Sequence, residues 1–377
     1  MSSIDFILIY ILLFCIFYIF CKKSIYYTSD SDFWKLALIP ILCFVIIEGC
    51  RYARGVDYLA YKYRFEHISP QDESQKIFLW LMQTLDGIGF DYVGAFMTYA
   101  LIFISCNIIF IRNSFNKDEA KWMYLLLLLS TLIKSESLIR QYIALPIIFV
   151  SFGAIFNKKW FIAIIFLFIA IGIHSGTIIL YPFVIIFYFI YKNIIPPKYT
   201  IPLLFAAYYI IPSGFLSEVG IKILNIFNLS ALGNENLNNY IENSDRWLGA
   251  DSFLKDAQQT PLTKTLQFIF DTSVILISYK ALKIRKNAIV TTFFNIISIG
   301  FILERSFFGY EIFQRMTGQL YIMWFIPLGY ALYIYNQIKH PREKTQMKLL
   351  LFLAIGYQIF YYGRFIFFSP KAMFIWS

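Results

Sequence analysis

Residues 160–191 form a run of 32 residues that contains no Asp, Glu, Lys or Arg. A membrane-crossing helix needs about 20 mainly apolar residues, so this run is too long for one upright helix and short for two. The run is interrupted at residues 172–176 by the sequence Gly-Ile-His-Ser-Gly. The interruption predicts two short apolar helices that meet at His174 and bring this histidine near membrane depth.

Apolar stretches of this kind recur along the whole chain. The predicted spans are 4–20, 33–50, 90–111, 122–137, 138–156, 159–174, 176–191, 200–212, 265–282, 287–304, 314–336 and 347–366. Only 15% of the residues are charged, against roughly 25% in soluble domains, which excludes a soluble multidomain protein. We therefore expect an all-α polytopic membrane protein with about 12 transmembrane helices, in which residues 1–377 form a single integral membrane domain.

Two segments depart from the pattern of apolar spans. Residues 74–89 place Phe78, Leu79, Met82 and Leu85 on one side of a helix, which is typical of an amphipathic helix that lies in the membrane interface or dips into the bilayer. Residues 213–263 are long and polar, and we expect them to form an external loop.

The distribution of charge predicts the orientation. The first span is followed by Lys22-Lys23, which favours an external N-terminus. The inner loops would then be 21–35, 112–121, 157–159, 192–199, 280–286 and 337–348. They contain 18 of the 33 lysines and arginines but only 5 of the 23 acidic residues. The net charge of +10 is therefore a topology signal and does not indicate nucleic-acid binding, and an even number of spans places the C-terminus outside as well.

Arginines show the opposite distribution to lysines. On the predicted outer side lie Arg51, Arg54, Arg64, Arg140, Arg246, Arg305, Arg315 and Arg364, which are 8 of the 11 arginines. A guanidinium suits two-point contact with phosphate and is less costly to dehydrate than an ammonium group. The arginines therefore indicate an anionic, phosphate-bearing ligand at the outer face.

Residues 48–61 are the densest candidate site. Their charged and aromatic members include Arg51, Arg54, Asp57, Tyr58 and Tyr61. Helical spacing would place these residues on one face, whereas Gly55 would instead turn the chain. We interpret the arginines as diphosphate ligands, Asp57 as an orienting or proton-accepting group, and the tyrosines as stacking surfaces for sugars. The alternative is an interfacial anchor with snorkelling arginines.

Two further candidates follow in the middle of the chain. Arg140-Gln141 opens the fifth predicted span, where a helix N-terminus also favours an anion; alternatively, Arg140 pairs with Glu136. His174 would act as a general base, unless it is a structural histidine.

The C-terminal third contributes the remaining candidates. Glu304, Arg305 and Arg315 flank a predicted outer loop, where they form ion pairs with neighbouring acids or supply anion contacts and a carboxylate base. Asp271 is an intramembrane acid, which indicates a function or a buried partner. The histidines and five cysteines show no metal-binding spacing, and nucleotide-binding motifs are absent from the sequence, so we expect neither a metal site nor a cofactor.

In order and membrane placement, these motifs resemble the EpsG family of exopolysaccharide proteins, a branch of the Wzy-type polymerases. The resemblance covers roughly residues 40–335. It rests on an Arg-x-x-Arg-Gly-x-Asp-Tyr-x-x-Tyr stretch at 51–61, Arg140-Gln141, His174-Ser175, and Arg315 with Tyr321. The sequence departs from the family pattern before the amphipathic segment, where Gln75-Lys76 stands in place of an acidic residue.

The resemblance implies a metal-independent glycosyltransferase of the GT-C type that polymerises O-antigen, capsule or exopolysaccharide. Its substrates would be undecaprenyl-diphosphate-linked oligosaccharides at the outer face of a bacterial inner membrane, and the candidate protein partners are a Wzz-type chain-length regulator and a Wzx-type flippase. The diphosphate ligands would be Arg51, Arg54, Arg140, Arg305 and Arg315; the base would be His174, Asp57 or Glu304; and the sugar contacts would be Tyr58, Tyr61 and Gln141. A flippase of the same lipid-linked sugar and an O-antigen-ligase-type transferase remain the alternatives.

Overall fold

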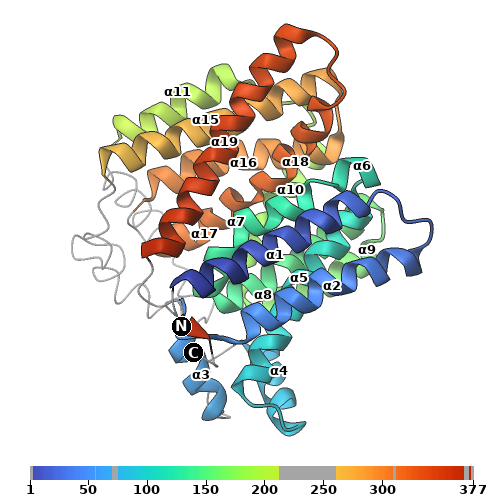
Figure 1. The fold of residues 1–377 in the computed structure, drawn as a ribbon, viewed down its shortest axis with the longest axis vertical. Coiled ribbons are helices and arrows are strands. Elements are labelled where there is room, and N and C mark those ends of the chain that lie inside the picture. The colour runs from blue at the N-terminus through green and yellow to red at the C-terminus, as the bar shows by residue number, and fades with distance from the viewer. Residues whose placement is uncertain are drawn as a thin grey trace. The chain divides into compact units, whose positions relative to one another are not determined.

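The computed structural model describes residues 3–55, 57–69, 75–211, 260–308, 311–368 and 373–374. These residues are almost entirely helical, as the apolar stretches predict, and they cluster into two compact units (Figure 1). Unit 1 comprises Met1–Pro182, Leu328–Lys339 and Gln358–Ser377. Unit 2 comprises Phe183–Pro327 and His340–Tyr357.

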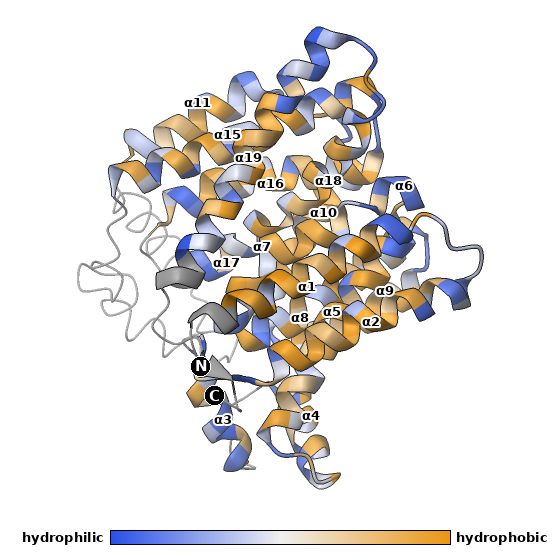
Figure 2. Ribbon diagram, in the orientation of Figure 1, coloured by the Kyte–Doolittle hydropathy of each residue, from blue (hydrophilic) through white to orange (hydrophobic). Residues whose placement is uncertain are grey.

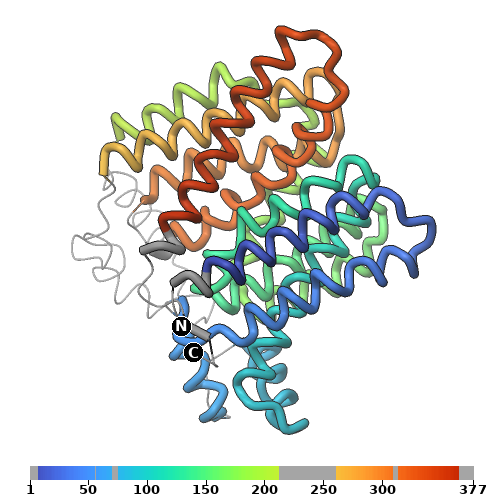
Figure 3. Tube along the Cα trace, in the orientation of Figure 1, coloured from blue at the N-terminus to red at the C-terminus, as the bar shows by residue number. Residues whose placement is uncertain are grey.

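Most of unit 1 comes from the N-terminal half of the chain. Its first elements are α1 (Ser3–Lys23), α2 (Asp30–Gly49), β1 (Arg51–Tyr52), α3 (Tyr58–Glu66), α4 (Lys76–Gly87), α5 (Tyr92–Ser114), α6 (Lys117–Ala120), α7 (Met123–Ser137), α8 (Ile139–Phe156), α9 (Trp160–Ile173) and a 3₁₀ turn at Ser175–Ile179. Figure 3 shows α1 and α2 running antiparallel beside each other. The short strand β1 pairs antiparallel with β2 (Met373–Phe374) near the C-terminus.

Unit 2 is built from helices of the C-terminal half. They are a π-helix at Ile185–Ile190, α11 (Pro197–Tyr209), α15 (Pro261–Ile284), α16 (Ala288–Ser306), α17 (Glu311–Tyr321) and a 3₁₀ turn at Ile322–Trp324. Three helices have residues in both units: α10 (Leu180–Val184), α18 (Phe325–Tyr335) and α19 (Pro341–Phe368). Figure 2 shows apolar residues along the helices of each unit and hydrophilic residues in α6 and the connecting segments.

Helix α8 lies at the centre of unit 1. Its apolar window is 89% buried, and its neighbours α5 and α9 pack along it. A helix that is apolar around its whole circumference is stable only when other elements surround it. The chain reaches α8 through a single residue, Leu138, because α7 ends at Ser137 and α8 begins at Ile139. The last turn of α7 and the first turn of α8 therefore lie at the same end of the unit.

Several predicted spans differ from single helices in the structure. Residues 176–191 form a 3₁₀ turn, α10 and a π-helix, and residues 314–336 form α17, a 3₁₀ turn and α18. Among the described residues, α5, α8 and α16 are the helices both long and apolar enough to cross a membrane, while α9 and residues 175–190 are shorter apolar helices. The all-helical prediction is confirmed, and the number of spans stays a prediction.

The predicted amphipathic segment forms α4. Its side chains at Phe78, Met82 and Leu85 are buried, whereas Trp80 is exposed. The helix packs on α5 and α9, so the buried stripe faces the unit. The predicted loop at 213–263 falls almost entirely outside the described residues.

Candidate functional site

The segment after α2 turns sharply and does not continue as a helix. Arg51 and Tyr52 form β1, and Gly55 adopts a φ of +85° in the left-handed region. A helix restarts only at Tyr58. Of the two interpretations of residues 48–61, the turn at Gly55 is therefore the observed one, and the arginines and tyrosines do not share one helical face.

Gly55 also brings this segment against the end of α7. A Cβ atom built on Gly55 would lie 1.9 Å from the backbone oxygen of Glu136. Only glycine permits both this approach and the positive φ. The close contact places the preceding residue, Arg54, beside the side chain of Glu136.

Arg54 is the centre of a buried charge cluster. Its Nη2 donates to Oε1 of Glu136 at 2.9 Å and lies 3.4 Å from Oε1 of Glu48. The same nitrogen contacts the hydroxyl of Tyr10 from α1, and the guanidinium lies over the ring of that tyrosine. Arg54 is only 2% exposed. It is therefore a buried partner of two carboxyl groups, whereas the sequence analysis predicts a diphosphate ligand at the outer face.

Arg51 extends the cluster toward a pocket. Its Nη1 donates to Oε2 of Glu48 at 2.8 Å, and its guanidinium lies 5.5 Å from the ring centre of Phe96. Its Nε is buried and has no hydrogen-bond partner among the described residues. Because a buried unsatisfied donor is costly, this nitrogen indicates a missing partner.

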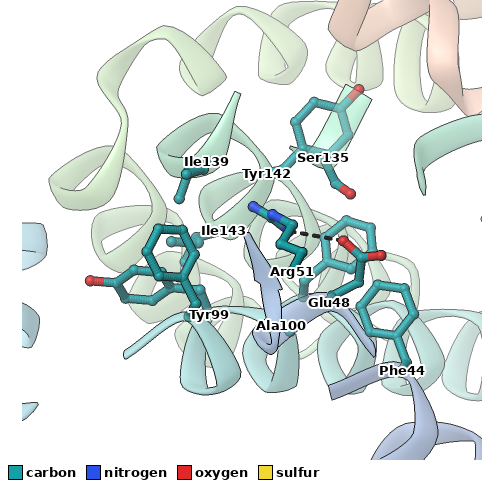
Figure 4. Close-up of a pocket in the computed structure, with 11 residues that line it drawn as sticks. Phe44, Glu48, Arg51, Tyr99, Ala100, Ser135, Ile139, Tyr142 and Ile143 are labelled. Carbon is teal, nitrogen blue, oxygen red and sulfur yellow. Dashed lines mark hydrogen bonds and ion pairs between the residues drawn. The ribbon is translucent and has the colours of Figure 1, made fainter. Parts of the chain in front are cut away.

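The pocket lies between α2, α5, α7 and α8 of unit 1. Its empty volume is about 320 Å³, part of which is open to solvent. Figure 4 shows the Arg51–Glu48 pair facing this space. Aromatic side chains form much of the lining; they are Phe44, Phe96, Tyr99, Phe103 and Tyr142. A mainly apolar pocket with a few convergent polar groups is typical of a small-molecule site.

The guanidinium of Arg140 has different hydrogen-bond partners from that of Arg54. It lies in the first turn of α8, where its Nε donates to the hydroxyl of Tyr61 at 2.6 Å. The guanidinium lies 5.8 Å from the ring centre of Tyr61 and 5.9 Å from that of Phe78. Its terminal nitrogens make no hydrogen bond or ion pair within the part of the chain that the structure describes. Glu136, the alternative partner in the sequence, lies against Arg54 instead.

The two tyrosines of this segment are tied into the packing. Burial raises the pKa of Tyr61, although the charge of Arg140 opposes the shift. Tyr58 is fully buried, stacks on Phe96 at 4.7 Å and meets Tyr52 edge-on. Its ring is therefore covered, which conflicts with the predicted role of Tyr58 as a stacking surface for a sugar. Asp57 is half-buried immediately before α3.

His174 ends α9 and is followed by the 3₁₀ turn. Gln75 fixes this turn from the start of α4: its Nε2 donates to the hydroxyl of Ser175 at 2.7 Å, and its Oε1 accepts from the backbone N–H of Ser175 at 2.9 Å. Gly172 lets Ile77 pack closely on α9. Gln75, which stands where the family pattern has an acidic residue, therefore connects the amphipathic helix to the turn that follows His174. Phe78 of the same helix contacts Arg140.

Unit 2 contains the remaining candidates. Asp271 is buried in α15 and accepts a hydrogen bond from Tyr208 of α11 at 2.7 Å, so the structure identifies its partner. Arg305 lies over the rings of Tyr208 and Phe308 at 4.7 and 4.5 Å. Glu304 accepts from Thr317 of α17 at 2.7 Å.

Two further predicted site residues, Arg315 and Gln141, lie within helices. Arg315 lies half-buried in α17, and its carbonyl accepts from Gln319. Gln141 is buried in the first turn of α8, next to Arg140. The described residues contain no group of three or more His, Cys, Asp or Glu side chains arranged to hold a metal ion.

Four residues of the described site are not among the predicted ligands, bases and sugar contacts: Tyr10, Glu48, Gln75 and Glu136. Tyr10 lies in an apolar helix rich in aromatics, where nothing in the sequence distinguishes it. Glu48 does carry a signal, because it is an acid near the end of an apolar span, three residues before Arg51.

Comparison with known proteins gives one match. The sequence model of the EpsG family matches residues 34–376, nearly the whole chain. No curated protein and no solved structure matches.

Proposed function

The chain belongs to the EpsG family, a family of Wzy-type polymerases, and from this membership we propose that it joins undecaprenyl-diphosphate-linked oligosaccharide repeats at the outer face of a bacterial inner membrane. The proposal includes twelve spans in a GT-C-type fold, with both termini external. The family and the apolar helices indicate a membrane protein of the polysaccharide polymerase type.

The observation that carries the proposal is the placement of Arg140. Tyr61 accepts a hydrogen bond from its Nε, while its two terminal nitrogens make no hydrogen bond or ion pair with the described residues. The N-terminal turn of α8 adds its own preference for negative charge. An arginine held in this way is ready to bind a phosphate oxygen without reorganising.

The proposed reaction needs such a cation because its leaving group is an anion. A hydroxyl of the acceptor sugar attacks the anomeric carbon of the donor glycan and forms the new C–O bond. The bond from that carbon to the diphosphate oxygen breaks, and the lipid diphosphate leaves with the electron pair. The hydroxyl proton passes to a base. The energy comes from the diphosphate linkage, so no cofactor is required, and arginines supply the charge stabilisation that a metal would otherwise provide.

His174 is the favoured base among the three candidates. Gln75 and Phe78, both at the start of α4, link the histidine turn to Arg140, and an imidazole titrates near neutral pH. Asp57 and Glu304 remain proposed alternatives. Arg305 and Arg315 are proposed as further diphosphate contacts, Tyr61 and Gln141 as sugar contacts, and proteins of the Wzz and Wzx types as partners.

The chain-length distribution of the surface polysaccharide in a deletion strain tests the proposal. A polymerase deletion leaves a single repeat unit on the surface, whereas loss of a flippase or ligase removes the surface glycan altogether. We expect collapse to one repeat, with the ladder restored by the wild-type gene. An unchanged ladder or complete loss of surface glycan would contradict the polymerase function.

A further inference from the structure

In the buried cluster of unit 1, one phenol hydroxyl lies within hydrogen-bond distance of two carboxyl groups. If both carboxyl groups were ionised, the phenol would have to supply the proton for both contacts. The hydroxyl of Tyr10 lies 2.9 Å from Oε1 of Glu48 and 2.9 Å from Oε1 of Glu136. A phenol has one proton and can donate it fully to only one acceptor. The second short oxygen–oxygen contact is a hydrogen bond only if one of the carboxyl groups carries a proton of its own.

The arginines distinguish the two carboxyl groups. Glu48 accepts from Arg51 at 2.8 Å and lies 3.4 Å from Arg54, so it faces two guanidinium groups. Glu136 contacts only one of these arginines, Arg54, in the described structure, and its Oε2 is buried without a hydrogen-bond partner. The proton therefore belongs on Oε1 of Glu136, from which it is donated to the oxygen of Tyr10.

The protonation state decides the charge of the cluster. The titratable and charged groups that face Glu136 come from α1, α2, the segment after α2, and α19: Tyr10, Glu48, Arg51, Arg54 and Tyr362. With Glu136 neutral, two arginines face one carboxylate, and the cluster has a net charge of +1. With Glu136 ionised, the net charge is zero.

We propose that Glu136 is protonated in the resting protein and that the resulting positive charge is offered to an anionic group through Arg51 at the pocket. Arg51 is 5% exposed, lines the pocket, and has a buried Nε without a hydrogen-bond partner among the described residues. A phosphate oxygen supplies both the missing acceptor and the missing negative charge. This inference rests on the proposed function for the identity of the anion, a lipid-linked diphosphate.

Glu48 and Glu136 are then positioning residues with opposite requirements. Glu48 must be ionised to hold Arg51 and Arg54 in place. Glu136 must be neutral, because its ionisation would cancel the charge that attracts the substrate. Polymerisation should therefore slow as the pH rises and Glu136 loses its proton, by about tenfold per pH unit for a single proton.

The contrast between Glu136→Gln and Glu48→Gln tests the inference. An amide cannot ionise, and it donates to Tyr10 as the protonated acid does. Glu136→Gln should keep polymerising at alkaline pH, where the wild-type enzyme has slowed at least tenfold, and should leave the acid limb of the profile in place. Glu48→Gln should lower the rate at least about a hundredfold at every pH. Tyr18→Phe changes an exposed tyrosine of α1 outside the cluster. It is the matched control for the effects of substitution and purification, and it should follow the wild-type profile.

Infrared spectroscopy of the purified protein gives a second test that does not depend on activity. The wild-type protein at neutral pH should show the carbonyl stretch of a protonated carboxyl group that disappears in Glu136→Gln. No such difference between the two proteins, or an alkaline limb unchanged in Glu136→Gln, would overturn the inference. If the purified wild-type protein forms no polymer while the infrared band is present, the proposed function fails and the protonation of Glu136 stands.

Discussion

At the residue scale, Arg54 and Arg140 show how one side-chain type serves two purposes in unit 1. Arg54 is enclosed by Tyr10, Glu48 and Glu136, whereas Arg140 donates through its Nε alone, to Tyr61, within the described part of the chain. The sequence indicates that both are unusual, because arginines at the ends of apolar spans are costly. It could not distinguish them, because Glu136 is 82 positions from Arg54 and Tyr10 is 126 positions from Glu136.

We predict that Arg140→Ala abolishes polymerisation without destabilising the protein. A charge-assisted contact to phosphate contributes roughly 1.5–3 kcal/mol, so the rate should fall at least about tenfold to a hundredfold. Arg140→Lys should restore only part of it, because an ammonium cannot form the two-point contact. Polymerisation by purified variants measures the effect, and Tyr61→Phe separates loss of the guanidinium from loss of its support. Full activity of Arg140→Ala would remove this residue from the site.

Arg54→Ala should instead act mainly on stability. It removes a buried guanidinium that lies against the carboxylate of Glu48 and donates to Glu136, and removing one partner of a buried charge pair costs about 3–5 kcal/mol. Thermal unfolding in detergent should show a clearly lowered midpoint. Lys62→Ala is the matched control: it removes a cation from the partly exposed Lys62–Glu66 pair, where about 0–1 kcal/mol is expected. Equal midpoints for the two variants would refute the structural role of Arg54.

At the element scale, the sequence predicts helices better than it predicts their interruptions. The amphipathic pattern of 74–89 predicts α4, and the break near residue 137 separates α7 from α8. In the divided segments at 175–190 and 311–335, no charged residue marks the positions of the 3₁₀ and π-helical turns. Their geometry depends on packing against neighbouring helices, which a local pattern does not contain. The same holds for Gly55, whose turn is fixed by contact with α7.

We predict that Gly55→Ala disrupts the site, whereas Gly89→Ala does not. Both glycines have a φ close to +86°, at +85° and +87°. At both positions alanine therefore carries about 1–2 kcal/mol of backbone strain. Only at position 55 would the new Cβ also meet backbone, 1.9 Å from the oxygen of Glu136, while position 89 is open.

The difference between these two variants isolates the contact of the Arg54 segment with α7. Polymerisation and thermal stability should both fall further in Gly55→Ala than in Gly89→Ala, and we expect activity to fall at least about tenfold more. The same loss in both variants would show that backbone strain alone, and not the approach to α7, limits this position.

At the scale of the whole molecule, the charge distribution predicts a topology that the helices alone do not determine. We predict that residues 280–286 and 337–348 are cytoplasmic and that 213–263 are external. Single cysteines introduced at Lys283 and Arg342, in a variant without the five native cysteines, should resist a membrane-impermeant reagent in intact cells and react after lysis. A cysteine at Asn239 should react in intact cells. Labelling of position 283 or 342 from outside would reverse the orientation.

The most direct test of the account is the reaction of the purified protein with one synthetic lipid-diphosphate-linked repeat and no nucleotide. We predict a ladder of products and release of one lipid diphosphate for each glycosidic bond formed, with both lost in Arg140→Ala. A purified, folded wild-type protein that leaves the lipid-linked repeat unchanged, or that lengthens the glycan without releasing lipid diphosphate, would contradict the account.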